Sequence, residues 1–394
     1  MSSSSRGVAV YFACQALAAS TTTLLVTVSG LVGAMLVADA RLATLPAALQ
    51  GLATLLTTYP ASQLMARAGR RAGFSLGALL GCAGAAAATL GIVRGSFVVY
   101  CAGTTLIGGH AGFATFYRFA AAESAAPGRR DRAVGWVMSA GVLAALLGPW
   151  LAGRTRDLGS SAFAGSFVLV LAMAAAALVV LQLLGAPAVV PVAAARRASL
   201  RDVAGAPAFL AVVAAAMVSG AVMVFVMTAT PLAMTGCHHA FDRTAHVIQW
   251  HVVAMFAPSL VTGRLVARYG APPVLLAGLG LCAVAAVVNA SGTTVAHFQI
   301  GLFVLGLGWN LAFIAATTAL ARVAVDERAT AQGLNDLLVF SAQALASLLA
   351  GVVEHTLGWR AVNLGVLPLV AAAGIAIWLR LRARPAPAIA AGNA

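Results

Sequence analysis

The stretch LMARAGRR at residues 64–71 has a counterpart later in the chain, VARYG at residues 266–270. Both copies end a long apolar run, and both place an arginine two residues before a glycine. The two glycines are about 200 residues apart, roughly half the length of the 394-residue chain. Repetition at this distance predicts a protein built from two similar halves.

The composition is that of a membrane protein. Hydrophobic residues make up 61% of the chain, charged residues make up 9%, and the mean hydropathy is +0.96. A soluble globular domain is far more polar. Twelve apolar runs are each long enough to cross ~30 Å of hydrocarbon as a helix, so we expect an all-α membrane protein with twelve transmembrane helices. The runs cover residues 8–36, 43–66, 73–93, 96–122, 133–153, 161–185, 207–234, 244–267, 272–291, 294–321, 331–353 and 359–380.

The arginines predict how the chain is oriented. All 24 basic residues are arginine, and with a cytoplasmic N-terminus 18 of them fall on the inner side. The six that fall outside are Arg41, Arg94, Arg154, Arg156, Arg243 and Arg360. This asymmetry follows the positive-inside rule and places both termini in the cytoplasm. The net charge of +14 therefore reflects topology, and no nucleic-acid partner is expected.

The twelve runs divide into two sets of six. Residues 1–185 are expected to form an N-terminal six-helix bundle, 186–206 a cytoplasmic linker, 207–382 a C-terminal six-helix bundle and 383–394 a disordered tail. Paired bundles of this kind are typical of transporters whose substrate site lies between the halves. The chain has no phosphate-binding loop and no catalytic motif. We therefore expect a secondary transporter in the lipid bilayer rather than an enzyme, with no cofactor.

The stretch at residues 64–71 resembles the loop between the second and third spans of the major facilitator superfamily. The resemblance extends over nearly the whole chain and implies that superfamily's fold. Two positions depart from the pattern, since Ala66 stands where the family has Asp and Ser62 stands where it usually has Gly. The departure at Ala66 puts in doubt the gating salt bridge that the family attributes to the Asp.

Two short motifs stand out within the second half. Met223-x-x-x-Met227 lies in the seventh run and His251-x-x-x-Met255 in the eighth. Residues four apart share one face of a helix, and thioether and imidazole groups select soft metals, above all cuprous copper. At 1.5 Å per residue Met223 and His251 both come out ~9 Å below the outer edge of the membrane. The four side chains are thus expected to form a ladder of copper ligands reached from the periplasm.

The same pair of motifs resembles the CcoA-type copper importers of the superfamily. This resemblance implies import of copper, as substrate, across the bacterial cytoplasmic (inner) membrane for assembly of the cbb3-type cytochrome oxidase. It also implies copper chaperones or oxidase assembly factors as partners. Related members that lack the motifs are thought to carry other substrates, including riboflavin.

Further polar groups are candidates for accessory roles. A periplasmic cluster of soft ligands could capture copper and pass it down the ladder, or could be an ordinary polar loop; its members are Met234, Cys237, His238, His239 and His246. Asp336 could relay protons or pair with a cytoplasmic arginine. Arg118 and Glu123 could form a gate, or could be a surface pair.

Two other functions remain open at this point. The first is transport of an organic solute, such as a vitamin or a drug, in an apolar cavity lined by Trp250, Gln249, Trp309 and Asn310. The second is a copper sensor or chaperone partner that does not transport. The buried methionines could also be ordinary packing, and His251 could bond a neighbouring carbonyl.

Overall fold

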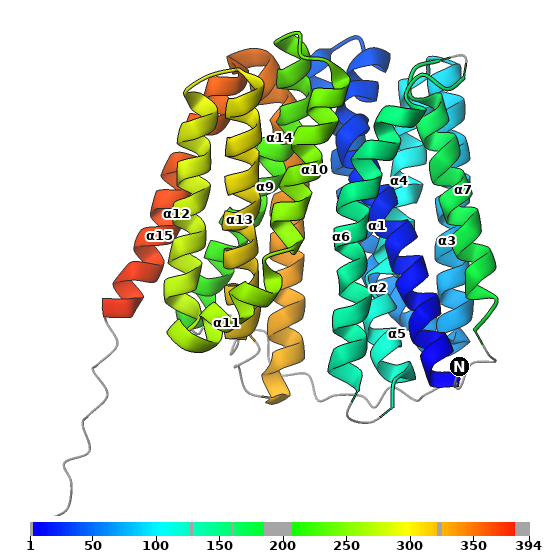
Figure 1. Ribbon diagram of the computed structural model, residues 1–394, viewed down its shortest axis with the longest axis horizontal. Coiled ribbons are helices and arrows are strands. Elements are labelled where there is room, and N and C mark those ends of the chain that lie inside the picture. The colour runs from blue at the N-terminus through cyan, green and yellow to red at the C-terminus, as the bar shows by residue number, and fades with distance from the viewer. Residues whose placement is uncertain (1–2, 127–128, 160, 185–206, 321–324, 383–394) are drawn as a thin grey trace, which may run out of the picture.

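The computed structural model describes residues 3–126, 129–159, 161–184, 207–320 and 325–382. These residues are helical, with short turns and no strand in the described ranges. The expected linker at 186–206 and the expected tail at 383–394 lie outside them. Figure 1 shows two bundles standing side by side, α1–α7 and α9–α15.

Each half of the chain supplies one bundle. The first comprises α1 (Ser3–Leu36), the short η1 (Ala40–Leu42), α2 (Leu45–Ala68), α3 (Arg70–Val93), α4 (Phe97–Ala114), α5 (Tyr117–Ser124), α6 (Arg130–Thr155) and α7 (Ala164–Leu181). The second comprises α9 (Pro207–Gly236), α10 (Phe241–Phe256), α11 (Ser259–Tyr269), α12 (Ala271–Ala290), α13 (Val295–Leu320), α14 (Val325–Leu364) and α15 (Leu367–Arg382).

The twelve expected spans can be traced in these helices. In the described part of the chain, nine helices are long and apolar enough to cross a membrane, and the bent pair α10 and α11 adds a tenth. One of the nine, Leu334–Leu379, contains two expected spans, because Gly358 interrupts it with φ 80° and ψ 174°. The remaining expected span is α2, which is more polar but has 24 residues. The all-helical prediction is confirmed.

The two copies of the opening motif form the same turn. α2 ends at Ala68, Gly69 has φ 85° and ψ 161°, and α3 begins at the next residue. α11 ends at Tyr269, and Gly270 has φ 83° and ψ 163° before α12. In both copies the glycine N–H bonds the carbonyl four residues back, at 3.0 and 2.9 Å. The sequence repeat therefore encodes a repeated backbone geometry that glycine adopts without strain.

The eighth span is broken, whereas the sequence predicted a continuous helix over 244–267. α10 ends at Phe256 and α11 begins at Ser259, and the two are bent by 42°. Pro258 explains the break, because proline has no N–H to donate and its ring clashes with the preceding turn. The packing of α13 against α10 and α11 depends on this break.

The bundles meet at one end of the molecule, which we call the closed end and define by η1 and the turn at residues 237–240. Thr44 donates to the Leu348 carbonyl and accepts the Gly351 N–H, both at 3.2 Å. Gln249 donates to the Leu146 carbonyl at 3.0 Å. These bonds hold α2 against α14 and α6 against α10.

Aromatic contacts reinforce the closed end. The rings of Phe163 and Phe241 pack edge to face at 5.3 Å, and the Arg156 guanidinium lies over both of them. Deeper in the molecule, ~22 Å below the start of α10, the Phe256 ring would lie 3.7 Å from a Cβ on Gly141. Among the described residues, no hydrogen bond or ring contact joins the bundles beyond that depth.

Replacing Gly69 with alanine tests the motif turn. A Cβ at φ 85° and ψ 161° is expected to destabilise the fold by ~1–3 kcal/mol and to lower the unfolding temperature of the purified protein in detergent. Gly280→Ala is the matched control, because Gly280 is helical and a Cβ there meets open space. Equal unfolding temperatures for the two variants would contradict the assignment of the turn.

Candidate functional site

The seam between α10 and α13 carries the histidine motif. Leu302, Gly306 and Asn310 are spaced four apart, so they lie along one face of α13. His251 Nδ1 contacts the Leu302 carbonyl at 2.6 Å. A Cβ on Gly306 would lie 2.6 Å from the His251 carbonyl oxygen, so only glycine allows this approach. The seam fixes the position of His251 relative to α13.

Asn310 spans the break between α10 and α11. Its Nδ2 donates to the Met255 carbonyl at 2.7 Å and to Ser259 Oγ at 2.9 Å. Its Oδ1 accepts from the Thr262 hydroxyl at 2.6 Å. One buried amide therefore satisfies polar groups on both sides of the bend, where hydrocarbon offers no water as a substitute.

The protonation of His251 follows from its surroundings. The side chain is fully buried, and a carbonyl oxygen can only accept, so Nδ1 carries the proton. Nε2 is then an unprotonated acceptor, and it has no hydrogen-bond partner. A histidine whose other ring nitrogen donates to a backbone carbonyl is the usual arrangement at a metal ion. An unpartnered Nε2 is therefore available to a ligand.

The three motif methionines belong to the buried core of the second bundle. Met223, Met227 and Met255 are 4%, 7% and 7% exposed. Measured from the closed-end termini of α9 and α10, Met227 and His251 both lie ~15 Å deep, and Met223 and Met255 ~20 Å deep. The predicted register of Met223 with His251 is thus shifted by one turn, because α9 extends to Gly236 and α10 begins at Phe241.

The helices that carry the two motifs pack on each other only slightly. α9 packs chiefly on α14 and α13, and α10 packs chiefly on α13 and α6. The two spans were expected to be neighbours with facing motifs, but α13 contacts both of them. All four motif side chains are buried, at 0% to 7% exposed, among the described residues.

The predicted capture cluster does not assemble. His239 Nε2 is held by the Thr293 carbonyl at 2.7 Å, and His246 packs against Trp250 at 6.2 Å. His238 has φ 59°, a turn conformation, and Cys237 is a free thiol. Met234 is fully buried in the core. Among the described residues, no three His, Cys, Asp or Glu side chains lie close enough to hold a metal ion.

The predicted gate between Arg118 and Glu123 is replaced by a different pair. Glu123 accepts two bonds from Arg70, at 2.6 and 3.0 Å. Arg118 lies over the Phe119 ring at 4.7 Å, and its Nε is buried without a partner. Residues five apart on a helix point about 140° away from each other, so Arg118 and Glu123 face different neighbours. The Arg70–Glu123 pair joins α3 to α5 within one bundle.

Asp336 was expected to relay protons or to pair with a cytoplasmic arginine, and its carboxylate interacts electrostatically with Arg118 of the first bundle without an ion-pair contact. Asp336 is exposed near the start of the described side chains of α14. It accepts a bond from the amide of its neighbour Asn335 at 3.1 Å. No ion pair to Asp336 forms among the residues that the structure describes.

Aromatic rings gather where the second bundle meets the first. Trp309 stacks on Phe313 at 4.8 Å with an interplanar angle of 15°, and its other neighbour is Phe256 at 6.2 Å. Phe256 in turn faces Gly141 of the other bundle, where an added Cβ would lie 3.7 Å from the ring. We call Phe256, Trp309 and Phe313 the aromatic cluster. Of these three residues only Trp309 was predicted from the sequence to line a cavity, although the four-residue spacing places Trp309 and Phe313 on one face of a helix.

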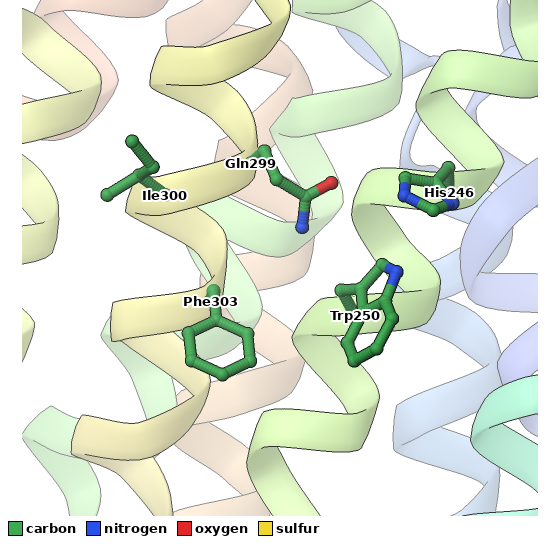
Figure 2. A pocket seen from close by; sticks show the side chains of 5 residues that line it. All are labelled: His246, Trp250, Gln299, Ile300 and Phe303. Atoms are coloured by element: carbon green, nitrogen blue, oxygen red, sulfur yellow. The ribbon is translucent and has the colours of Figure 1, made fainter.

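The other residues proposed to line an organic-solute cavity are dispersed. Gln249 is committed to the contact with Leu146, and Asn310 is committed to the break in the eighth span. Trp250 instead lines a groove shown in Figure 2. Only Trp309 remains beside the junction of the bundles.

Comparisons with known proteins establish the family. The model of the Major Facilitator Superfamily matches residues 234–394. Riboflavin transporter RfnT of Brucella anthropi is 41% identical over 388 residues, 97% of this chain and 98% of that protein. The uncharacterized MFS-type transporter YdeG of Bacillus subtilis is 30% identical over 91% of this chain and 88% of that protein. The chain belongs to the major facilitator superfamily and is a multi-pass secondary transporter.

Solved structures share the fold at low sequence identity. A POT family transporter in complex with 5-aminolevulinic acid has a TM-score of 0.71 at 13% identity, covering 96% of each chain. The nucleoside transporter NupG has a TM-score of 0.72 at 13% identity, covering 98% of this chain and 100% of that one. These likenesses confirm the twelve-helix architecture in two bundles.

Asn310→Leu tests the buried amide at the break. The leucine is similar in size but leaves the Met255 carbonyl and two hydroxyls without their partner, which is expected to cost ~1–3 kcal/mol. The unfolding temperature should fall, and transport should fall with it. Thr317→Val on the same helix is the control, since that exposed hydroxyl bonds only its own helix. Equal effects of the two substitutions would contradict the role of Asn310.

Proposed function

We propose that this protein carries a planar organic solute of the riboflavin type across the bacterial cytoplasmic membrane by alternating access. The observation that carries the proposal is the 41% identity to a riboflavin transporter along 97% of the chain. The aligned region includes both bundles. Copper import, which the motifs favoured, is the second candidate.

The aromatic cluster supports a planar substrate. Trp309 and Phe313 present stacked rings, and Phe256 closes the cluster beside the other bundle. Flat conjugated ring systems bind such surfaces by offset stacking. The cluster lies at the inner limit of the contacts between the bundles, so rocking of the bundles would expose it to one side of the membrane and then to the other.

Copper remains a candidate because of one specific observation. His251 Nε2 is buried, unprotonated and without a partner, and the same core holds the thioethers of Met223, Met227 and Met255. These are ligands of the soft type that a carrier of cuprous copper would need. Metal held by neutral, exchangeable groups can be released again, as transport requires.

Met227→Leu distinguishes the two candidates. The substitution nearly conserves volume in the core, so the fold is expected to tolerate it, but it removes the thioether. The organic-solute proposal predicts unchanged uptake of labelled riboflavin in cells. Met217→Leu in the same helix is the control. Two results together would overturn the proposal in favour of copper. The unaltered protein would take up no riboflavin, and uptake of radioactive copper would be lost in Met227→Leu but not in Met217→Leu.

Trp309→Leu tests the stacking surface. Removing an aromatic stacking partner costs ~0.5–1.5 kcal/mol, so the KM for riboflavin uptake should rise about two- to tenfold. Trp309→Phe should restore most of the loss. Trp378→Leu on α15 is the control, because that ring packs under Arg382 on an outer helix. A KM unchanged by Trp309→Leu would contradict substrate binding at the aromatic cluster.

A further inference from the structure

A groove of about 480 Å³ runs between α10 and α13 near the closed end. It is lined by His246, Trp250, Gln299, Ile300 and Phe303, and Figure 2 shows the Gln299 side chain reaching from α13 toward α10. Ile300 and Trp309 are nine residues apart on α13, which places them on opposite sides of that helix. The groove therefore opens away from the bundle junction, onto the side of the protein that faces lipid.

The polar groups of the groove lie at headgroup depth. His246 is ~8 Å from the start of α10 and Gln299 is ~6 Å from the start of α13. Gln299 Oε1 is buried without a hydrogen-bond partner. A buried amide oxygen without a donor is unfavourable, and Gln299 lines the groove, so this acceptor points to a ligand that brings a donor.

A positive charge lies on the same face of the helix, toward the membrane surface. Arg243 precedes His246 by three residues and Trp250 by seven, so the three side chains are aligned along α10. Arg243 is exposed, and among the described residues no carboxylate lies within ion-pair distance of it. Below these groups the surface is apolar, with Trp250 42% and Ile300 54% exposed.

We propose that this groove binds one anionic phospholipid of the phosphatidylglycerol type from the leaflet at the closed end. The lipid phosphate lies against Arg243 and His246. A hydroxyl of the glycerol headgroup donates to Gln299 Oε1. One acyl chain covers Trp250, Ile300 and Phe303. The site is separate from the transport site and does not depend on which solute is carried.

Native mass spectrometry of the full-length protein in detergent tests the proposal. Phosphatidylglycerol and phosphatidylcholine with the same acyl chains are titrated separately. The expected result is one retained phosphatidylglycerol per protein at low lipid concentration, with weaker retention of phosphatidylcholine. Equal retention of the two lipids would overturn the proposal, because the groove would then not recognise the headgroup.

Matched variants locate the site. Arg243→Gln is expected to weaken phosphatidylglycerol binding by about fivefold, the effect of one basic side chain at a membrane surface. Arg154→Gln is the control, because it removes one positive charge from the other bundle at the same end, where Arg154 lies over Trp150. Equal weakening by both variants, or by neither, would overturn the assignment.

A second substitution separates headgroup recognition from net charge. Gln299→Leu leaves the charge unchanged but removes the acceptor for the headgroup hydroxyl. It is expected to reduce the preference for phosphatidylglycerol over phosphatidic acid with the same acyl chains, which lacks the glycerol headgroup. An unchanged preference would contradict the role assigned to Gln299.

Discussion

The bond from Asn310 Nδ2 to the Met255 carbonyl is the contact on which the second bundle depends. A transmembrane helix normally satisfies all of its own backbone groups, because hydrocarbon offers no partner. Pro258 interrupts that pattern in the middle of the eighth span, and α10 and α11 meet at 42°. Asn310 bridges the bend with bonds to Met255, Ser259 and Thr262. The break can exist in the membrane because one side chain of α13 completes it.

The same seam determines what the histidine motif can do. The Leu302 carbonyl accepts a hydrogen bond from the His251 Nδ1–H, and the backbone of α10 approaches Gly306 so closely that no other residue fits there. The His251 ring is therefore fixed with its Nε2 facing the buried core of the second bundle. One turn deeper, the bend turns Phe256 toward Trp309 and the other bundle. His251 and Met255, the buried metal-ligand candidates, and Phe256 of the aromatic cluster thus lie on different faces of one broken helix. The first face would serve copper, and the second would serve a planar organic solute.

The sequence predicted the repeated architecture well, because its signals are local. An arginine, a glycine and the end of an apolar run were enough to identify two equivalent turns, and Gly69 and Gly270 have nearly the same backbone angles. The depth of the motifs was predicted less well. It depends on where α9 ends and α10 begins, and a shift of a few residues moved Met223 out of level with His251.

Contacts between distant segments could not be predicted from the sequence. Glu123 pairs with Arg70, 53 residues away, rather than with the nearby Arg118. Asn310 was expected to line a cavity, but its side-chain amide bonds residues at the break in the eighth span, including Ser259, 51 residues earlier. Phe256 was not noticed, because nothing in its local sequence shows that it faces the other bundle. All three contacts are determined by which helices are neighbours in the folded protein. The neighbours of a helix cannot be read from its local sequence motif.

Direct binding of a flavin-like solute to the aromatic cluster can be measured without transport, coupling ions or partners. Riboflavin is titrated with the purified protein and the flavin fluorescence is followed. We expect saturable quenching that Trp309→Leu weakens and that Met227→Leu leaves unchanged. Two results together would contradict flavin binding at the aromatic cluster. The unaltered protein would show no quenching, and it would bind cuprous copper stoichiometrically in a way that Met227→Leu abolishes.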